Sequence, residues 1–318
     1  MAVVRLNFSP KRPARGDGQG WSAPLRAALA QTPVGAPICL LIHGYRYHPE
    51  RASRDPHQLI FSTGIAHRDA TVVSWPHHLG FGSGRRDEGL CIALGWPSDG
   101  TIWRAYRRAE MAGQALAEVF DLLAASPQNP TSILCHSLGA RVALVAAAAA
   151  RQPRLARMII MAGAEHADIA QETARNLSPE GTEFYNICSR GNDLFDALFE
   201  IGMGAAGKMG RALGQGLNDP PPNWLNIQID APETRLALQA FGAPIAAPLR
   251  PICHWSGYKR PGLFRFYRRL IREPDAHLFA TLAQALPSQP STRWSRFRGH
   301  PRGLCAVDPG RRPPPQNR

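Results

Sequence analysis

The residue of this sequence best suited to chemistry is a serine between a predicted strand and a predicted helix. It lies in the stretch "SILCHSLGAR", residues 132–141, where β-forming residues lead into Ser137 and an Ala-rich helical run follows at once. A serine on such a sharp turn projects its hydroxyl above the sheet, as a nucleophile must. The turn needs small residues two positions before and after the serine. Cys135 and Gly139 stand there, and cysteine is the weaker match. We interpret Ser137 as a nucleophile near the favourable dipole of the next helix; the alternative is a serine that only caps this helix.

The segments around Ser137 alternate between strand and helix patterns. Continuous apolar runs, typical of buried parallel strands, occupy residues 37–42, 90–96, 131–136, 157–164, 183–190 and 225–229. Helical spacing of apolar residues occurs in residues 102–125, 138–151, 232–242 and 262–271. This order predicts an α/β fold with a mostly parallel sheet and helices on both faces. Residues 71–75 indicate one more short strand, and the Gly-rich apolar residues 194–226 a helix followed by a flap.

Three motifs together carry a resemblance to a known family. They are "LLIHGYR" at the end of the first long strand, "ALGWPSDG" at the end of the second, and "CHSLGAR" around Ser137. In this order they resemble the α/β-hydrolase fold, and more closely a group of bacterial α/β-hydrolase-like proteins with His-Gly-Tyr, Trp-Pro-Ser and small-His-Ser-x-Gly motifs. The resemblance covers residues 37–272.

The resemblance implies where the partners of Ser137 stand, because this fold takes its acid and its histidine from later loops in the order Ser, Asp, His. Asp193 follows the predicted strand 183–190 and is the expected acid. Asp193 as a helix cap, Asp196, and the earlier Glu165 and Asp168 stay open as alternatives. His254 lies in a Gly-containing loop before the last predicted helix and is the expected base. The alternative His277 lies in a late helix, and His300 falls in the basic tail.

The resemblance also implies an oxyanion hole and a pocket. The backbone N–H groups of Leu138 and Tyr45 are the expected donors to the oxyanion. Four residues are expected to line the substrate pocket: His43, Gly44, Trp96 and Trp255. The predicted reaction is cleavage of a carboxylic ester or thioester of a small apolar substrate through an acyl-enzyme, which needs no metal or organic cofactor. The alternative is a non-catalytic binding or scaffold protein on the same fold.

Two other patterns in the sequence favour different sites but are weak. Residues 202–209, "GMGAAGKM", nearly match a phosphate-binding loop, yet methionine replaces the hydroxyl residue and the preceding segment is helical rather than a strand. Six of the 11 histidines fall within residues 43–78, without the spacing that a metal site favours.

The charge and cysteine content exclude several other classes of protein. The net charge is +13, but much of the excess lies in the Pro-rich residues 1–20 and 291–318. We therefore expect no specific nucleic-acid partner, and only loose contact of the tails with anionic surfaces. The six cysteines form no CxxC pair, which favours reduced thiols.

The predicted organisation is a single catalytic domain between two extensions. Residues 1–30 are expected to form a partly disordered N-terminal extension, residues 31–285 the hydrolase domain, and residues 286–318 a disordered basic tail. No apolar run is long enough to span a membrane, and no secretory signal is present, so a cytoplasmic location is expected. The sequence does not define the oligomeric state.

Overall fold

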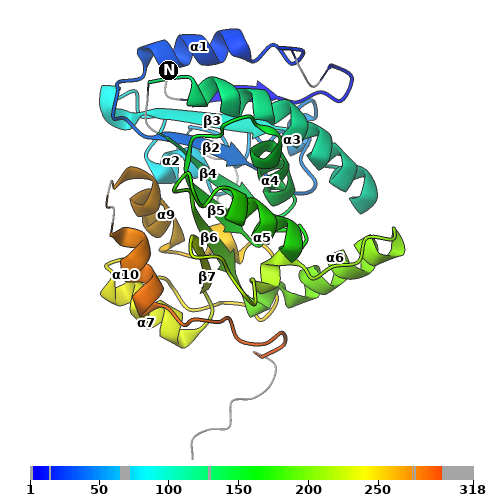
Figure 1. The fold of residues 1–318 in the computed structure, drawn as a ribbon, viewed down its shortest axis with the longest axis vertical. Coiled ribbons are helices and arrows are strands. Elements are labelled where there is room, and N and C mark those ends of the chain that lie inside the picture. The colour runs from blue at the N-terminus through cyan, green and yellow to red at the C-terminus, as the bar shows by residue number, and fades with distance from the viewer. Residues whose placement is uncertain are drawn as a thin grey trace, which may run out of the picture.

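The computed structural model describes residues 3–13, 16–64, 72–127, 130–273, 275 and 277–295. Seven parallel strands form one sheet in the order β1-β3-β2-β4-β5-β6-β7 (Figure 1). The strands are β1 Val3–Asn7, β2 Ile38–Ile42, β3 Leu90–Gly95, β4 Thr131–His136, β5 Leu155–Met161, β6 Glu183–Cys188 and β7 Trp224–Gln228. The predicted parallel α/β architecture is therefore confirmed.

The helices cover both faces of the sheet. They are α1 Ser22–Gln31, α2 Trp75–Leu79, α3 Ile102–Ala124, α4 Gly139–Ala149, α5 Ala167–Asn176, α6 Asp193–Ala205, α7 Pro232–Ala240, α8 Ser256–Lys259, α9 Leu263–Arg272 and α10 Leu278–Ala285. None of the helices in the described part of the chain is long and apolar enough to cross a bilayer.

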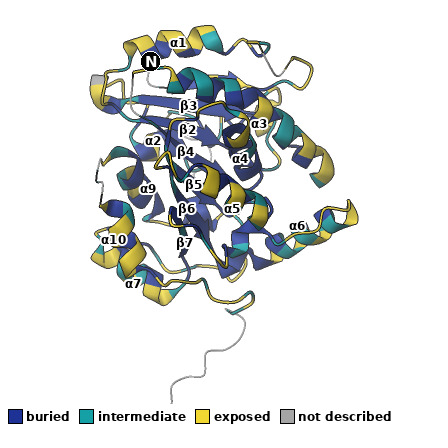
Figure 2. Cartoon of the chain, viewed as in Figure 1, coloured by how far each residue is buried: buried dark blue, intermediate teal, exposed yellow. Residues whose placement is uncertain are grey.

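Alternate residues of each strand supply two separate apolar cores. In β2, Leu40 packs with α1, α3 and α4 on one face, whereas Leu41 packs with α2 and α9 on the other. Because side chains of a strand point alternately to opposite faces, a strand buried on both faces must be apolar throughout. Every residue of β2, β3 and β4 is buried (Figure 2).

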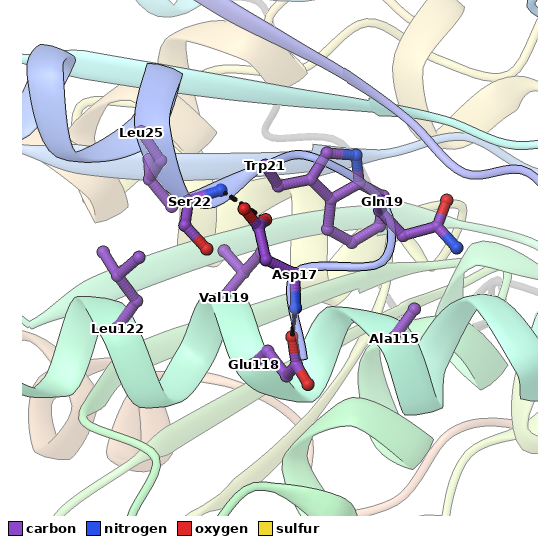
Figure 3. Close-up of a pocket in the computed structure, with 9 residues that line it drawn as sticks. All are labelled: Asp17, Gln19, Trp21, Ser22, Leu25, Ala115, Glu118, Val119 and Leu122. Atoms are coloured by element: carbon purple, nitrogen blue, oxygen red, sulfur yellow. Dashed lines mark hydrogen bonds between the residues drawn. The ribbon is translucent and has the colours of Figure 1, made fainter. Parts of the chain in front are cut away.

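The N-terminal extension is part of the sheet. β1 pairs with β3 as an edge strand, and the loop before α1 is anchored to α3. The backbone N–H groups of Gly16 and Asp17 donate to the Glu118 carboxylate at 2.5 and 3.2 Å, and Asp17 accepts from Ser22 N at 3.0 Å (Figure 3). The small pocket at this junction involves none of the loops that carry Ser137 or His254.

Two further segments differ from their predictions. The described residues of 71–75 form no strand. Helix α2 begins at Trp75 instead, because Ser74 caps it by accepting from His77 N at 3.2 Å and Pro76 occupies its first turn. Residues 287–295, predicted as part of the tail, contact the domain: Ser291 N donates to Gln228 Oε1 at 2.7 Å. The rest of the predicted tail lies outside the described residues.

Candidate active site

The strand order places the serine motif at the centre of the sheet. β2 and β4 are neighbours, but the chain leaves β2 toward β3 on one side and leaves β4 toward β5 on the other. Such a reversal at the carboxyl ends of parallel strands is where open α/β sheets bind their ligands. Ser137 follows β4 there, and His43 and Gly44 follow β2.

Ser137 occupies a strained turn between β4 and α4. Its φ is +53°, in the left-handed region that residues other than glycine avoid. The cost of such a backbone is on the order of 1–3 kcal/mol, which the surrounding contacts must offset. Three backbone hydrogen bonds of 3.0 Å hold the turn: Ser137 N donates to Met161 O, and Ser137 O accepts from Ala140 N and Ala164 N. A positive φ at a serine between a strand and a helix is the backbone conformation predicted for a nucleophile turn.

Two glycines permit the close packing around this turn. A Cβ on Gly139 would lie 2.6 Å from Ile42 O and 2.7 Å from His43 O. A Cβ on Gly44 would lie 2.7 Å from Ser137 Cβ and 2.9 Å from His136 O. The loop after β2 therefore lies directly against the serine, as the predicted oxyanion hole requires.

The two predicted oxyanion donors are unpaired in the described part of the chain. Neither Tyr45 N nor Leu138 N donates to any described protein acceptor. The Tyr45 hydroxyl is engaged instead, because it donates to Gly100 O. Unpaired backbone N–H groups are rare inside proteins, and these two flank Ser137.

His43 and Trp96, both predicted to line the pocket, are fully buried structural residues. His43 Nδ1 donates to Gly44 O at 2.8 Å, and its Nε2 accepts from Trp96 N at 3.0 Å. Trp96 Nε1 donates to His43 O at 3.1 Å, and the two rings stack with centroids 5.4 Å apart. Burial lowers the pKa of His43 to about 3, so its ring stays neutral. The role predicted for these two side chains is corrected: they hold the loop after β2 in place.

The serine of the Trp-Pro-Ser motif completes this support. Ser98 Oγ lies 2.8 Å from Gly44 O and 3.1 Å from Tyr47 O, and it accepts from Tyr47 N at 2.9 Å. Arg46 N also donates to Ser98 O at 3.2 Å. The motif thus fixes the backbone that presents Tyr45 N.

His254 is oriented by an amide. Its Nδ1 lies 2.7 Å from Asn192 Oδ1, and Asn192 Nδ2 donates to Asp196 Oδ1 at 2.8 Å. Because the Asp196 carboxylate accepts a hydrogen bond from the amide N–H, the amide oxygen faces His254 and accepts a hydrogen bond from Nδ1–H. Nε2 is then the unprotonated nitrogen, as a general base needs. Burial also lowers the pKa of His254 well below 6.5, so the ring is neutral at pH 7.

The loop that carries His254 is attached to the elements around it. Cys253 N donates to Gly191 O at 2.9 Å, which joins the loop to the turn after β6. His136, the residue before Ser137, lies with Nε2 3.1 Å from His254 O and with its ring centroid 4.7 Å from that of His254. Ser137 and His254 are therefore neighbours through His136. The described contacts include no direct hydrogen bond between their side chains, a bond that is often long before substrate binds.

Asp193, the predicted acid, makes other contacts. One carboxylate oxygen accepts from Trp294 N and the other lies 3.4 Å from the Arg190 guanidinium, with both side chains buried. Burial raises the pKa of Asp193. The described contacts place Asn192 against His254 instead, because the 3₁₀ turn Arg190–Asn192 ends one residue before α6 begins. The sequence prediction of a carboxylate missed Asn192, which stands in the same Gly-Asn-Asp turn.

The alternative acids and base lie elsewhere. Glu165 is buried against Arg141, with Oε2 2.5 Å from the guanidinium, and Asp168 is exposed in the first turn of α5. His277 is exposed before α10. The fourth predicted pocket residue, Trp255, is 47% exposed and lies beside His254, with ring centroids 6.2 Å apart.

The parallel sheet, its central switch point and the strained serine define an α/β hydrolase architecture. Residues 23–192 match the model of the family described as "Alpha/beta hydrolase of unknown function (DUF900)", and the chain belongs to this family. The matched segment includes Ser137 and ends at Asn192, before His254. None of the curated proteins compared with the chain matches it.

Proposed function

We propose that this protein is a serine hydrolase that cleaves carboxylic esters or thioesters through an acyl-enzyme. The observation that carries the proposal is the strained Ser137 turn, beside which the N–H groups of Tyr45 and Leu138 donate to no acceptor among the described residues. Backbone strain of this kind clusters at active sites, where it is part of the mechanism. The proposed base is His254, whose neutral ring contacts His136, the residue before Ser137.

The proposed reaction uses four groups of the chain. His254 Nε2 removes the proton from Ser137 Oγ, and Oγ attacks the carbonyl carbon of the substrate. The N–H groups of Tyr45 and Leu138 hold the oxyanion that forms. The C–O or C–S bond then breaks as His254 returns its proton to the leaving alcohol or thiol. Water then attacks the acyl-enzyme as His254 takes its proton, and His254 returns this proton to Ser137 Oγ when the acyl C–O bond breaks and the acid leaves.

Asn192 is proposed to replace the acid of the usual triad. An amide oxygen orients the imidazole and accepts from Nδ1, as in the Cys-His-Asn arrangement of papain-like proteases. It stabilises the imidazolium less than a carboxylate does, because it carries no negative charge. The second candidate function is binding without catalysis. The observation that favours it is that a neutral amide, and not a carboxylate, contacts His254.

The test is labelling with a fluorophosphonate probe, which reacts only with an activated serine. We expect the wild-type protein to label, and Ser137→Ala and His254→Ala to lose labelling while keeping the wild-type circular dichroism spectrum. Hydrolysis of p-nitrophenyl esters of increasing acyl length then measures turnover. A folded wild-type protein that neither labels nor hydrolyses any ester would refute the proposal and favour a binding protein.

A further inference from the structure

Helix α6 exposes a row of apolar side chains although it buries two acidic ones. Its acidic residues Asp193 and Asp196 are buried, whereas Leu194, Leu198 and Ile201 are 39, 57 and 69% exposed. These three apolar residues are spaced i, i+4 and i+7 and therefore share one face of the helix. A surface helix normally turns that face to the core. Figure 1 shows α6 projecting from the body of the molecule, and Figure 2 shows exposed residues along it.

The burial of acidic side chains on α6 has a cause inside the protein. Asp196 binds the amide that orients His254, and Glu200 lies 2.9 Å from the Arg293 guanidinium and accepts from Ala212 N at 2.8 Å. The inner face combines these polar contacts with the buried apolar residues Phe199 and Met203. Leu194, Leu198 and Ile201 remain on the outer face, without a described partner element.

This apolar face is extended by a tryptophan near each end of α6. Trp103, 47% exposed, donates from Nε1 to Gly202 O at 2.8 Å. Trp255 packs edge-on to Phe195, with ring centroids 6.3 Å apart. Phe195 also stacks on His254 at 4.7 Å, so the surface is continuous with the candidate active site. We call it the α6 surface: Leu194, Leu198, Ile201, Trp103 and Trp255.

Cations flank the α6 surface. Lys259 lies 6.0 Å from the centroid of the Trp255 ring, and Lys208, just beyond the end of α6, lies 4.9 Å from the centroid of the Tyr106 ring. The chain has only three lysines, so two of them are here. The exposed Arg104 follows Trp103.

We propose that the α6 surface docks this protein onto an anionic phospholipid surface. An amphipathic helix with leucine-type residues on the outer face, indole rings near its ends and flanking cations suits the boundary between headgroups and acyl chains. Tryptophan prefers that boundary, and lysine is attracted by anionic headgroups there. A protein partner is less favoured, because an apolar groove of a protein would bind the leucine-type residues but would not supply the negative charges that pair with the flanking cations. Docking of this face would bring His254 and Ser137 next to lipid-borne apolar molecules.

The experiment is co-sedimentation of the full chain with vesicles of phosphatidylcholine, with and without phosphatidylglycerol. We expect binding to the anionic vesicles, and a decrease of about tenfold or more in vesicle affinity for Leu198→Ser/Ile201→Ser, since affinity follows the apolar area that inserts. The matched control is Val34→Ser/Leu236→Ser, which removes two exposed apolar residues elsewhere and is expected to bind as the wild type does. Ser137→Ala is also expected to bind fully, which separates docking from the proposed chemistry.

Three results would overturn the proposal. Equal vesicle binding by the wild-type and α6 variants would assign binding to the basic ends of the chain. No binding of the wild type to either vesicle would exclude lipid docking. A wild-type dimer in light scattering that becomes a monomer in Leu198→Ser/Ile201→Ser, without vesicle binding, would make a second copy the occupant.

Discussion

The contact between His254 and Asn192 leads to a quantitative prediction that separates Asn192 from Asp193. The hydrogen bond to Nδ1 is 2.7 Å long and becomes charge-assisted when the imidazole takes the proton of Ser137. Hydrogen bonds to charged groups contribute about 1.5–3 kcal/mol. Asn192→Ala is therefore expected to lower kcat/KM for an ester substrate roughly 10- to 150-fold.

Asp193→Asn is expected to act on stability instead. It removes the charge that faces the buried Arg190 guanidinium at 3.4 Å. Breaking a buried ion pair from one side costs about 3–5 kcal/mol, because the other charge stays uncompensated. The folded fraction should keep kcat within a few-fold of the wild-type value. If Asp193 were the triad acid, the same substitution would lower kcat by about 10⁴.

The assay is steady-state ester hydrolysis at a temperature where both variants are folded, checked by circular dichroism and urea denaturation. A third variant, Asn192→Asp, places a carboxylate beside His254 and should raise the pKa of that imidazole, which moves the acid limb of the kcat/KM profile to higher pH. A collapse of kcat in folded Asp193→Asn, with Asn192→Ala fully active, would refute the assignment of Asn192.

Three further predictions concern the support of the site. Gly44→Ala should abolish fluorophosphonate labelling, because its Cβ would lie 2.7 Å from Ser137 Cβ, whereas Gly64→Ala, with nothing within 4 Å, should label normally; equal labelling would contradict the close packing. Ser98→Ala should lower the free energy of unfolding, measured by urea denaturation, by about 1–3 kcal/mol, because the buried partners of its hydroxyl lose their hydrogen bonds. An unchanged denaturation midpoint would contradict the support of the loop after β2 by Ser98. The free energy of unfolding should also fall by a few kcal/mol between pH 7.5 and 5. His43, whose pKa falls to about 3 on folding, binds protons at pH 5 only when unfolded and alone accounts for about 2 kcal/mol. His57, His136 and His254 act in the same direction, whereas Asp196, with a pKa raised to about 7, opposes them; constant stability over this range would contradict the burial of neutral histidines.

The central architecture could be predicted because it depends on strong local signals. Strands buried on both faces must be apolar throughout, and the runs at 37–42, 90–96 and 131–136 coincide with β2, β3 and β4 to within a residue. Edge strand β1 was missed, since its five residues "VVRLN" are too few and too polar to form a continuous apolar run, and the basic residues Lys11 and Arg12 follow shortly after. β1 is a strand because it pairs with β3, which lies more than 80 residues later in the chain. The local sequence pattern does not predict such a distant pairing.

For the candidate site, the prediction reached only the loops. The resemblance to the α/β-hydrolase fold predicts the acid in the turn after β6 and the base in the loop before α8. Which side chain of "GND" turns toward His254 depends on where the 3₁₀ turn Arg190–Asn192 ends and α6 begins. A difference of one residue rotates a side chain by about 100° around a helix, and sequence patterns do not locate helix ends that accurately.

For the proposed serine hydrolase, the buried polar motifs around Ser137 indicate where substrate selectivity would lie. His43, Trp96 and Ser98 satisfy each other or the loop backbone and are fully buried, so they do not touch a substrate. The groups left to face one are backbone N–H groups, which treat all acyl carbonyls alike. Discrimination between substrates must then come from the exposed side of the site, where Phe195 and Trp255 pack beside His254. Because both residues adjoin the α6 surface, replacing Trp255 by alanine should change KM for long acyl esters more than kcat for short ones.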